Sequence, residues 1–163
     1  MAAKNNPGDG LVGRTLVITR VFDAPRNVVF NAWTDPGHLE QWWGPDGFTN
    51  PVCEAEARPG GAIRIHMRGP DGTVYPMTGV FREIDEPARL VFDANALDDA
   101  GQELFTISNV VAFTEQGGRT TLKLEARVVS AKNEGKHHLD GMEAGWTQSL
   151  GRLASYLKNQ GTS

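Results

Sequence analysis

The chain has 163 residues, of which 39% are hydrophobic and 22% charged, with a formal net charge of -4. A chain of this length can bury about 70% of the surface that its unfolded form exposes, so a single domain with its own core is expected. The acidic balance and the lack of a run of Lys and Arg argue against a nucleic acid as partner. Because Cys53 is the only cysteine, no intramolecular disulfide is possible.

The N-terminal segment MAAKNNPGDG is polar and lacks the apolar core of a secretion signal, so a cytoplasmic location is expected. Residues 1–12 are predicted to form a flexible tail and residues 13–161 a single domain. No apolar run approaches the roughly 20 residues of a membrane-spanning helix, so no membrane insertion is expected.

A strand and two short helices are predicted first. Residues 14–23, RTLVITRVFD, are rich in β-branched side chains and predict a strand with both faces partly covered. Asp23 can cap the helix that follows, and Pro25 suits its first turn. Asp35 and Pro36 open a second short helix, which ends at the turn GPDGF.

From Pro51 onward the hydrophobic period changes to two, which predicts an antiparallel meander with one dry face. The predicted strands cover residues 52–57, 62–68, 73–85, 89–94, 104–115 and 120–129. Between the second and third of them, GPDG is a hairpin turn signal.

The C-terminal segment carries the strongest periodic signal of the chain. Its apolar residues, spaced by three or four positions, form one stripe on a helix over residues 139–160: Leu139, Met142, Trp146, Leu150, Leu153 and Leu157. At about 1.5 Å per residue this helix is about 33 Å long, enough to cross a sheet of six or seven strands. We therefore expect an α+β fold in which a curved antiparallel sheet wraps around a long C-terminal helix.

Gly141, Gly145 and Gly151 lie inside this predicted helix, where each glycine costs about 1 kcal/mol relative to alanine. Either a close approach of helix to sheet requires them, or they leave room beside a cavity. The nearby residues His137 and His138 are interpreted as part of a solvated loop, and no metal site or cofactor is expected.

Polar residues on a dry face are the first place to look for chemistry. Asn109 interrupts the apolar face of the strand at residues 104–115, and an unpaired amide there costs free energy. It either orients a ligand or satisfies the backbone at a β-bulge. His66 shares a face with Arg64 and Arg68 that the alternation assigns to the outside, unless a bulge reverses it.

For two further residues the alternation does not decide which face of the sheet the side chain occupies. Tyr75 and Thr78 lie in a run that contains Pro76 and Gly79, so either side chain could point inward. No motif for nucleophilic catalysis is present, and no catalytic residue is assigned.

Four phrases of the sequence resemble the START-like superfamily, also called SRPBCC or helix-grip, and its branch named for the activator of heat-shock protein 90 ATPase homologues. In chain order they are APRNVVFNAWTDPGHLEQWWGP, EARPGGAIRIHMRGPDG, GVFREIDEPARLVF and DGMEAGWTQSLGRLASYL. The resemblance spans about residues 14–160. It implies an internal cavity between the concave face of the sheet and the long helix, closed at one end by the two short helices.

The function that this resemblance implies is the binding of a small apolar or amphipathic molecule. The expected ligand-binding residues are Trp33, Trp42, Trp43, Phe48, Met67, Tyr75, Phe92, Phe105, Asn109, Met142, Trp146 and Leu150. The tryptophans among them either line the cavity or only pack the core. One alternative is a cavity-based enzyme of the cyclase or hydrolase kind, which needs an inward acid or base such as His66. Another is a protein-interaction module with a protein partner or as a homodimer.

Overall fold

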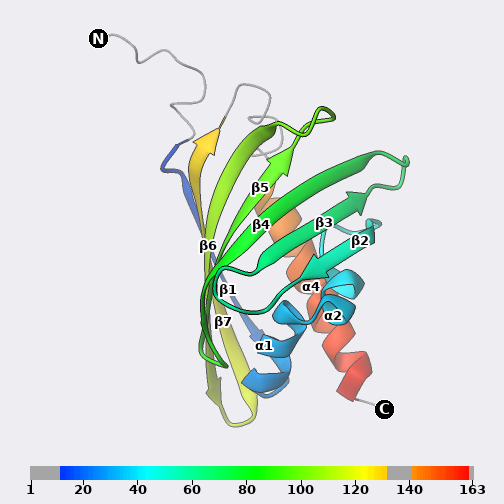
Figure 1. Ribbon diagram of the computed structural model, residues 1–163. Coiled ribbons are helices and arrows are strands. Elements are labelled where there is room, and N and C mark those ends of the chain that lie inside the picture. The colour runs from blue at the N-terminus through cyan, green and yellow to red at the C-terminus, as the bar shows by residue number, and fades with distance from the viewer. Residues whose placement is uncertain (1–11, 132–140, 162–163) are drawn as a thin grey trace.

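The computed structural model describes residues 12–131 and 141–161. Its elements in chain order are β1 (Thr15–Phe22), α1 (Arg26–Thr34), α2 (Pro36–Trp42), β2 (Thr49–Ala55), β3 (Ala62–Arg68), β4 (Val74–Asp85), β5 (Arg89–Leu97), β6 (Glu103–Gln116), β7 (Arg119–Ala131) and α4 (Met142–Gly161). The strands form one seven-stranded antiparallel sheet in the order β1-β7-β6-β5-β4-β3-β2. The sheet curves around α4, with α1 and α2 at one end, as Figure 1 shows. The predicted helix-grip fold is confirmed.

Strict alternation along the long strands separates a concave face, which meets α4, from a convex face. On β5 and β6 the opposed pairs Phe92 with Asn109 and Ala94 with Ile107 belong to the concave face. The intervening pair of Asp93 and Ser108 belongs to the convex face. This register decides which side chains of the sheet can reach the space under α4.

The edge strand β1 differs from its prediction. Its convex side carries Val17 and Val21, which are 52% and 53% exposed. Only the concave side, with Leu16 and Ile18, is partly covered. The expectation that both faces are covered was wrong because β-branched residues suit any strand and do not report what packs on it.

The two short helices begin in different ways. The carboxylate of Asp35 accepts a hydrogen bond from the backbone N–H of Gly37 at 2.8 Å, which confirms the predicted cap of α2. The predicted cap of α1 by Asp23 was wrong, because no side chain caps that helix from its N-cap position. Instead Glu115 of β6 accepts from the backbone N–H of Arg26 at 2.8 Å, a contact across 89 positions that local sequence could not reveal.

The element bounds follow the predictions with small shifts. β2 starts at Thr49 rather than residue 52, and β5 continues to Leu97 rather than 94. The C-terminal helix starts at Met142, so Gly141, which was predicted to lie inside it, belongs to the turn before it. Leu139, His137 and His138 lie outside the described residues, as does almost all of the predicted tail.

Among the described residues, no helix combines the length and the apolar character needed to cross a lipid bilayer.

Candidate functional site

A cavity of about 290 Å³ lies between the N-terminal half of α4 and the concave face of the sheet. On one side it is lined by Met142, Gly145, Trp146 and Ser149 of α4 and by Trp43, Gly44, Pro45 and Phe48 of the loop after α2. On the other side β3, β4, β5 and β6 contribute Met67, Tyr75, Met77, Ala96, Phe105 and Asn109, among others. The wall is therefore built by five elements and one loop.

Small side chains on facing walls create the room. Ala94 and Ala96 occupy consecutive concave-face positions of β5, and Gly145 and Ser149 face them from α4. A methyl group added at Gly145 would have Cγ of Pro45 as its nearest neighbour, at 3.8 Å, so close packing does not require this glycine. Of the two interpretations of the helix glycines, Gly145 supports room beside a cavity.

Gly151 behaves differently from Gly145. It does not line the cavity, and its added methyl group would meet only Nη1 of Arg20, at 3.8 Å. Neither of the two interpretations explains this glycine.

The tryptophans form a partition between the cavity and the core. The rings of Trp33 and Trp146 stack with centroids 5.8 Å apart, and those of Trp43 and Trp146 meet edge to face at 5.4 Å. Trp42 packs behind, with its ring 4.9 Å from that of Trp33 and its indole N–H donated to the carbonyl of Ala32. Trp43 and Trp146 face the cavity, whereas Trp33 and Trp42 fill the core.

The predicted ligand-binding residues divide along this partition. Those that line the cavity are Trp43, Phe48, Met67, Tyr75, Phe105, Asn109, Met142 and Trp146. Those that do not are Trp33, Trp42, Phe92 and Leu150, each at most 3% exposed and packed in the core. Trp33 and Phe92 border only a second void of about 10 Å³, scarcely the size of one water molecule.

These four residues were assigned to the cavity because alternation and helical spacing predict which face is buried. They do not predict at which point along the face the packing opens.

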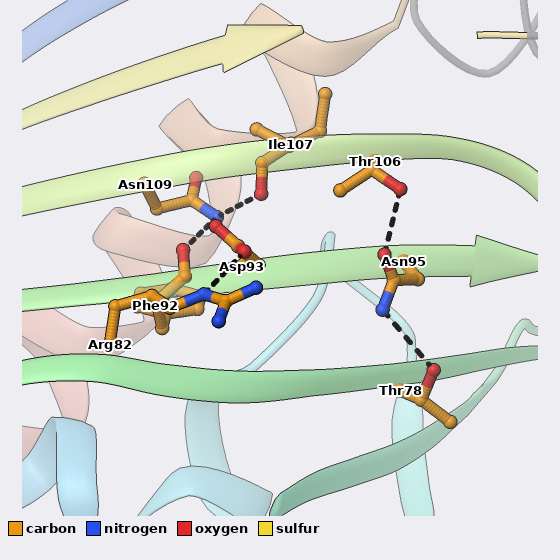
Figure 2. A network of polar contacts seen from close by, with 8 residues as sticks. All are labelled: Thr78, Arg82, Phe92, Asp93, Asn95, Thr106, Ile107 and Asn109. Atoms are coloured by element: carbon orange, nitrogen blue, oxygen red, sulfur yellow. Dashed lines mark hydrogen bonds and ion pairs between the residues drawn. The ribbon is translucent and has the colours of Figure 1, made fainter. Parts of the chain in front are cut away.

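Asn109 is the one carboxamide among the described residues that line the cavity. It is 1% exposed, and its Nδ2 donates to the carbonyl oxygens of Phe92 at 3.4 Å and Ile107 at 3.3 Å (Figure 2). Its Oδ1 is buried without a hydrogen-bond partner in the described structure. The nitrogen serves the backbone beside the bulge at Thr106 and Ile107, as one interpretation of this residue expects. The other interpretation, that Asn109 orients a ligand, stays a prediction.

Two hydroxyl groups also belong to the described lining, those of Tyr75 and Ser149. Ser149 donates its Oγ hydrogen to the carbonyl of Gly145 at 2.9 Å. Tyr75 lines the cavity, whereas Thr78 lies on the convex face, where it accepts a hydrogen bond from Asn95 (Figure 2). Of the described residues that line the cavity, none is Asp, Glu, Lys, Arg or His.

His66 does not line the cavity. The pairing of β3 with β4 runs without a bulge from Ala62 to Arg68. His66 therefore alternates with Ile65, which is 1% exposed, and with the cavity residue Met67. His66 therefore does not supply the inward acid or base that the enzyme alternative needs.

Arg152 of α4 fixes the loop that forms the rim of the cavity. Its Nη1 donates to the carbonyl oxygens of Trp43, Gly44 and Pro45 at 3.1, 2.9 and 2.9 Å. Burial lowers the pKa of this guanidinium, and the nearby carboxylate of Asp46 acts in the opposite direction. Sequence reasoning missed Arg152 because it considered only the apolar stripe of the helix.

A second side-chain contact joins α2 to α4 outside the cavity. Nδ1 of His38 on α2 and the hydroxyl of Tyr156 on α4 share a hydrogen bond of 2.5 Å. Burial raises the pKa of Tyr156, and the carboxylate of Asp35 adds to the rise. This pair joins α2 to α4 and lies outside the cavity.

No group of three or more His, Cys, Asp or Glu side chains among the described residues is arranged to hold a metal ion. Burial raises the pKa of the Cys53 thiol to about 11, with smaller contributions from Glu40 and Glu54. The thiol is therefore protonated at neutral pH and is not an activated nucleophile.

A curved antiparallel sheet gripping one long helix, with a hollow between them, defines a START-like, helix-grip protein. The model of the family described as Activator of Hsp90 ATPase homolog 1-like protein matches residues 23–158, and the chain belongs to this family. No curated protein sequence matches the chain.

Solved structures share the fold over most of their length. A protein from Mycobacterium smegmatis is 30% identical, with a TM-score of 0.75 over 91% of each chain. A protein from Arthrobacter aurescens is 29% identical, with a TM-score of 0.79 over 89% of this chain and 86% of its own. A protein named AHSA1 from Silicibacter pomeroyi is 25% identical, with a TM-score of 0.77 over 90% of this chain and 99% of its own.

Proposed function

We propose that this protein binds a small apolar or amphipathic molecule in the cavity under α4. The observation that carries the proposal is the cavity itself, a space of about 290 Å³ whose described wall contains no ionisable side chain except that of Tyr75. Ligand pockets are mostly apolar with a few placed polar groups, and this wall has that composition.

The volume limits the size of the molecule. A dry protein cavity of about 150 Å³ accommodates benzene. A space of about 290 Å³ accordingly suits a body of about two fused rings or a short branched chain. Desolvation of such a body on the apolar wall supplies the free energy of binding, at about 25 cal/mol for each Å² of apolar surface removed from water.

The wall also suits a ligand of variable shape. Met67, Met77 and Met142 all border the cavity, and methionine adapts to irregular surfaces because its chain is unbranched and flexible. Trp43 and Trp146 add flat surfaces against which a ring can stack.

The test is a thermal-shift screen of neutral one-ring and two-ring compounds, followed by titration of tryptophan fluorescence. A binder at a hundred times its dissociation constant stabilises the fold by about 2.7 kcal/mol. Because Trp43 and Trp146 line the cavity, the same ligand is expected to change the emission of the protein.

A pair of variants on the two faces of the sheet locates the binding. Ala96→Phe places a ring inside the cavity and is expected to abolish binding without unfolding the protein. Ala112→Phe is the control, because Ala112 pairs with Lys123 on the convex face. Binding that survives in Ala96→Phe, or a broad library in which no compound shifts the wild-type protein, would contradict the proposal.

A further inference from the structure

We propose that the ligand is a neutral molecule that presents a hydrogen-bond donor, a hydroxyl or an N–H group, to Oδ1 of Asn109. This inference rests on the proposed function, because it assigns a chemical class to the occupant of the same cavity. It follows from the orientation of one buried amide, the position of Asn109 in the cavity, and the charge of the wall.

The orientation of the amide is fixed by its neighbours. Nδ2 of Asn109 lies 3.4 Å from the carbonyl oxygen of Phe92 and 3.3 Å from that of Ile107. Both neighbours are acceptors only, so the group facing them must be the N–H₂ donor, and a flipped amide would place three acceptors together. Figure 2 shows the nitrogen of Asn109 turned toward these two carbonyls. The oxygen therefore lies on the side of the amide away from these carbonyls, on a residue that lines the cavity.

That oxygen has no partner in the described structure. Asn109 is 1% exposed, and its Oδ1 is one of few buried side-chain atoms without a hydrogen bond. A buried acceptor that is left unpaired is costly, and a ligand that donates a hydrogen bond removes the cost. A ligand with only acceptors, such as an ether or a ketone, leaves it in place.

The position of Asn109 along the cavity indicates which end of the ligand carries the hydrogen-bond donor. Along the concave face of β6, Phe105, Ile107 and Asn109 line the cavity. The next concave residue, Val111, is 0% exposed and belongs to the packed core. Asn109 thus stands at the inner end of the cavity, so the donor enters first and the apolar body extends back along β6 toward Phe105.

The wall discriminates against anions. None of the described residues that line the cavity is Lys, Arg or His, so no cationic side chain in that part of the wall compensates the desolvation of a carboxylate. The hydroxyl hydrogen of Ser149 is already donated to Gly145, which leaves Ser149 as a second acceptor. Both groups favour a donor and disfavour negative charge.

The test uses four probes of one shape with the full chain: 2-naphthol, 2-methoxynaphthalene, naphthalene and 2-naphthoate, compared by isothermal titration calorimetry at neutral pH. We expect 2-naphthol to bind about tenfold more tightly than 2-methoxynaphthalene, as one additional hydrogen bond to a buried acceptor implies. We expect 2-naphthoate to bind more weakly than either.

Asn109→Leu isolates the contribution of the amide. The variant is expected to retain naphthalene while the preference for 2-naphthol over the methyl ether falls from about tenfold to about one. If the wild-type protein binds the two compounds equally, or if Asn109→Leu keeps the preference, the donor inference is wrong and the proposed function stands. If no probe binds, both are wrong.

A second measurement does not depend on the stability of the variant. In the wild-type protein, NMR of the side-chain amide of Asn109 reports directly on the contact with the ligand. Saturation with 2-naphthol is expected to shift these resonances well beyond the effect of 2-methoxynaphthalene. Equal shifts from the two probes would overturn the assignment of Asn109 as the acceptor.

Discussion

The two halves of α4 pack against the same sheet in opposite ways. From the middle of the helix to its C-terminal end, Leu150, Leu153 and Leu157 are at most 8% exposed and belong to the core. In the N-terminal half Met142 and Trp146 continue the same stripe but border the cavity. The hydrophobic period is continuous across both halves, so it is side-chain size that separates a packed interface from a hollow one.

The largest expected difference comes from truncating one side chain in each half. Leu153→Ala is expected to lower the free energy of unfolding by about 3 kcal/mol, because Leu153 is 0% exposed and its loss leaves a void. Met142→Ala only enlarges an existing space and is expected to cost about 1 kcal/mol or less. Urea denaturation of both variants measures the contrast, and equal losses would break the distinction between the halves.

Arg152 joins the hollow half to the loop at its rim. Arg152→Met removes the donors to Trp43, Gly44 and Pro45 and is expected to cost about 2 kcal/mol, because three part-buried carbonyl oxygens lose a charged partner. Faster hydrogen exchange in the loop at residues 43–48 is expected with it. The control is Lys158→Met on the exposed side of α4, for which little change is expected. A loop that exchanges at the wild-type rate in Arg152→Met would contradict this role.

The two glycines of the helix give a sharper comparison. Gly145→Ala and Gly151→Ala remove the same backbone flexibility, and each is expected to stabilise the fold by up to about 1 kcal/mol, since neither added methyl group approaches another atom more closely than 3.8 Å. Only the methyl group at Gly145 enters the cavity. Gly145→Ala is therefore expected to weaken a two-ring ligand, whereas Gly151→Ala leaves its dissociation constant unchanged. Equal effects on binding would place the ligand elsewhere.

The smallest expected effect concerns the ionisation of Cys53, which packs against the core and not against the cavity. It is half-buried against the core, and its thiol pKa is raised from 9.0 to about 11. As pH rises from about 9 to 11 the thiol ionises in the unfolded chain before it ionises in the folded one. The contribution of the buried neutral thiol to the free energy of unfolding is therefore complete below pH 9 and is lost as the pH rises from 9 to 11.

The measurement is the rate of Cys53 alkylation by iodoacetamide as a function of pH. The folded protein is expected to show a midpoint near 11, and the urea-unfolded chain a midpoint near the ordinary value of 9.0. A folded protein that reacts with the midpoint of the unfolded chain would show that this side of the sheet opens readily.

The architecture could be predicted from the sequence because each element has a local cause. The apolar stripe of residues 142–157 predicts the helix that grips the sheet, and Asp35 with Pro36 predicts the start of α2. The cap of α1 could not be predicted, because its acceptor, Glu115, comes from the far end of the meander.

The site could be predicted only in part, for a similar reason. Asn109 is recognisable because a carboxamide interrupts an apolar face. Ala94 and Ala96 are the sequence signal for the cavity on β5, because they are small residues at consecutive concave-face positions. Trp33 was misplaced because a tryptophan in the core and one on a cavity wall share the same pattern, and only the facing residues distinguish them.

The contacts of Arg152 bear on how a guest would be received. With three backbone oxygens tied to one guanidinium, the loop at residues 43–48 is held in position by contacts within the protein itself. A loop that is already ordered loses little conformational entropy when a ligand binds. The affinity is then expected to depend little on the motion of this loop. If the proposed function is correct, selectivity would accordingly come from the shape of a rigid wall rather than from closure of the loop around the ligand.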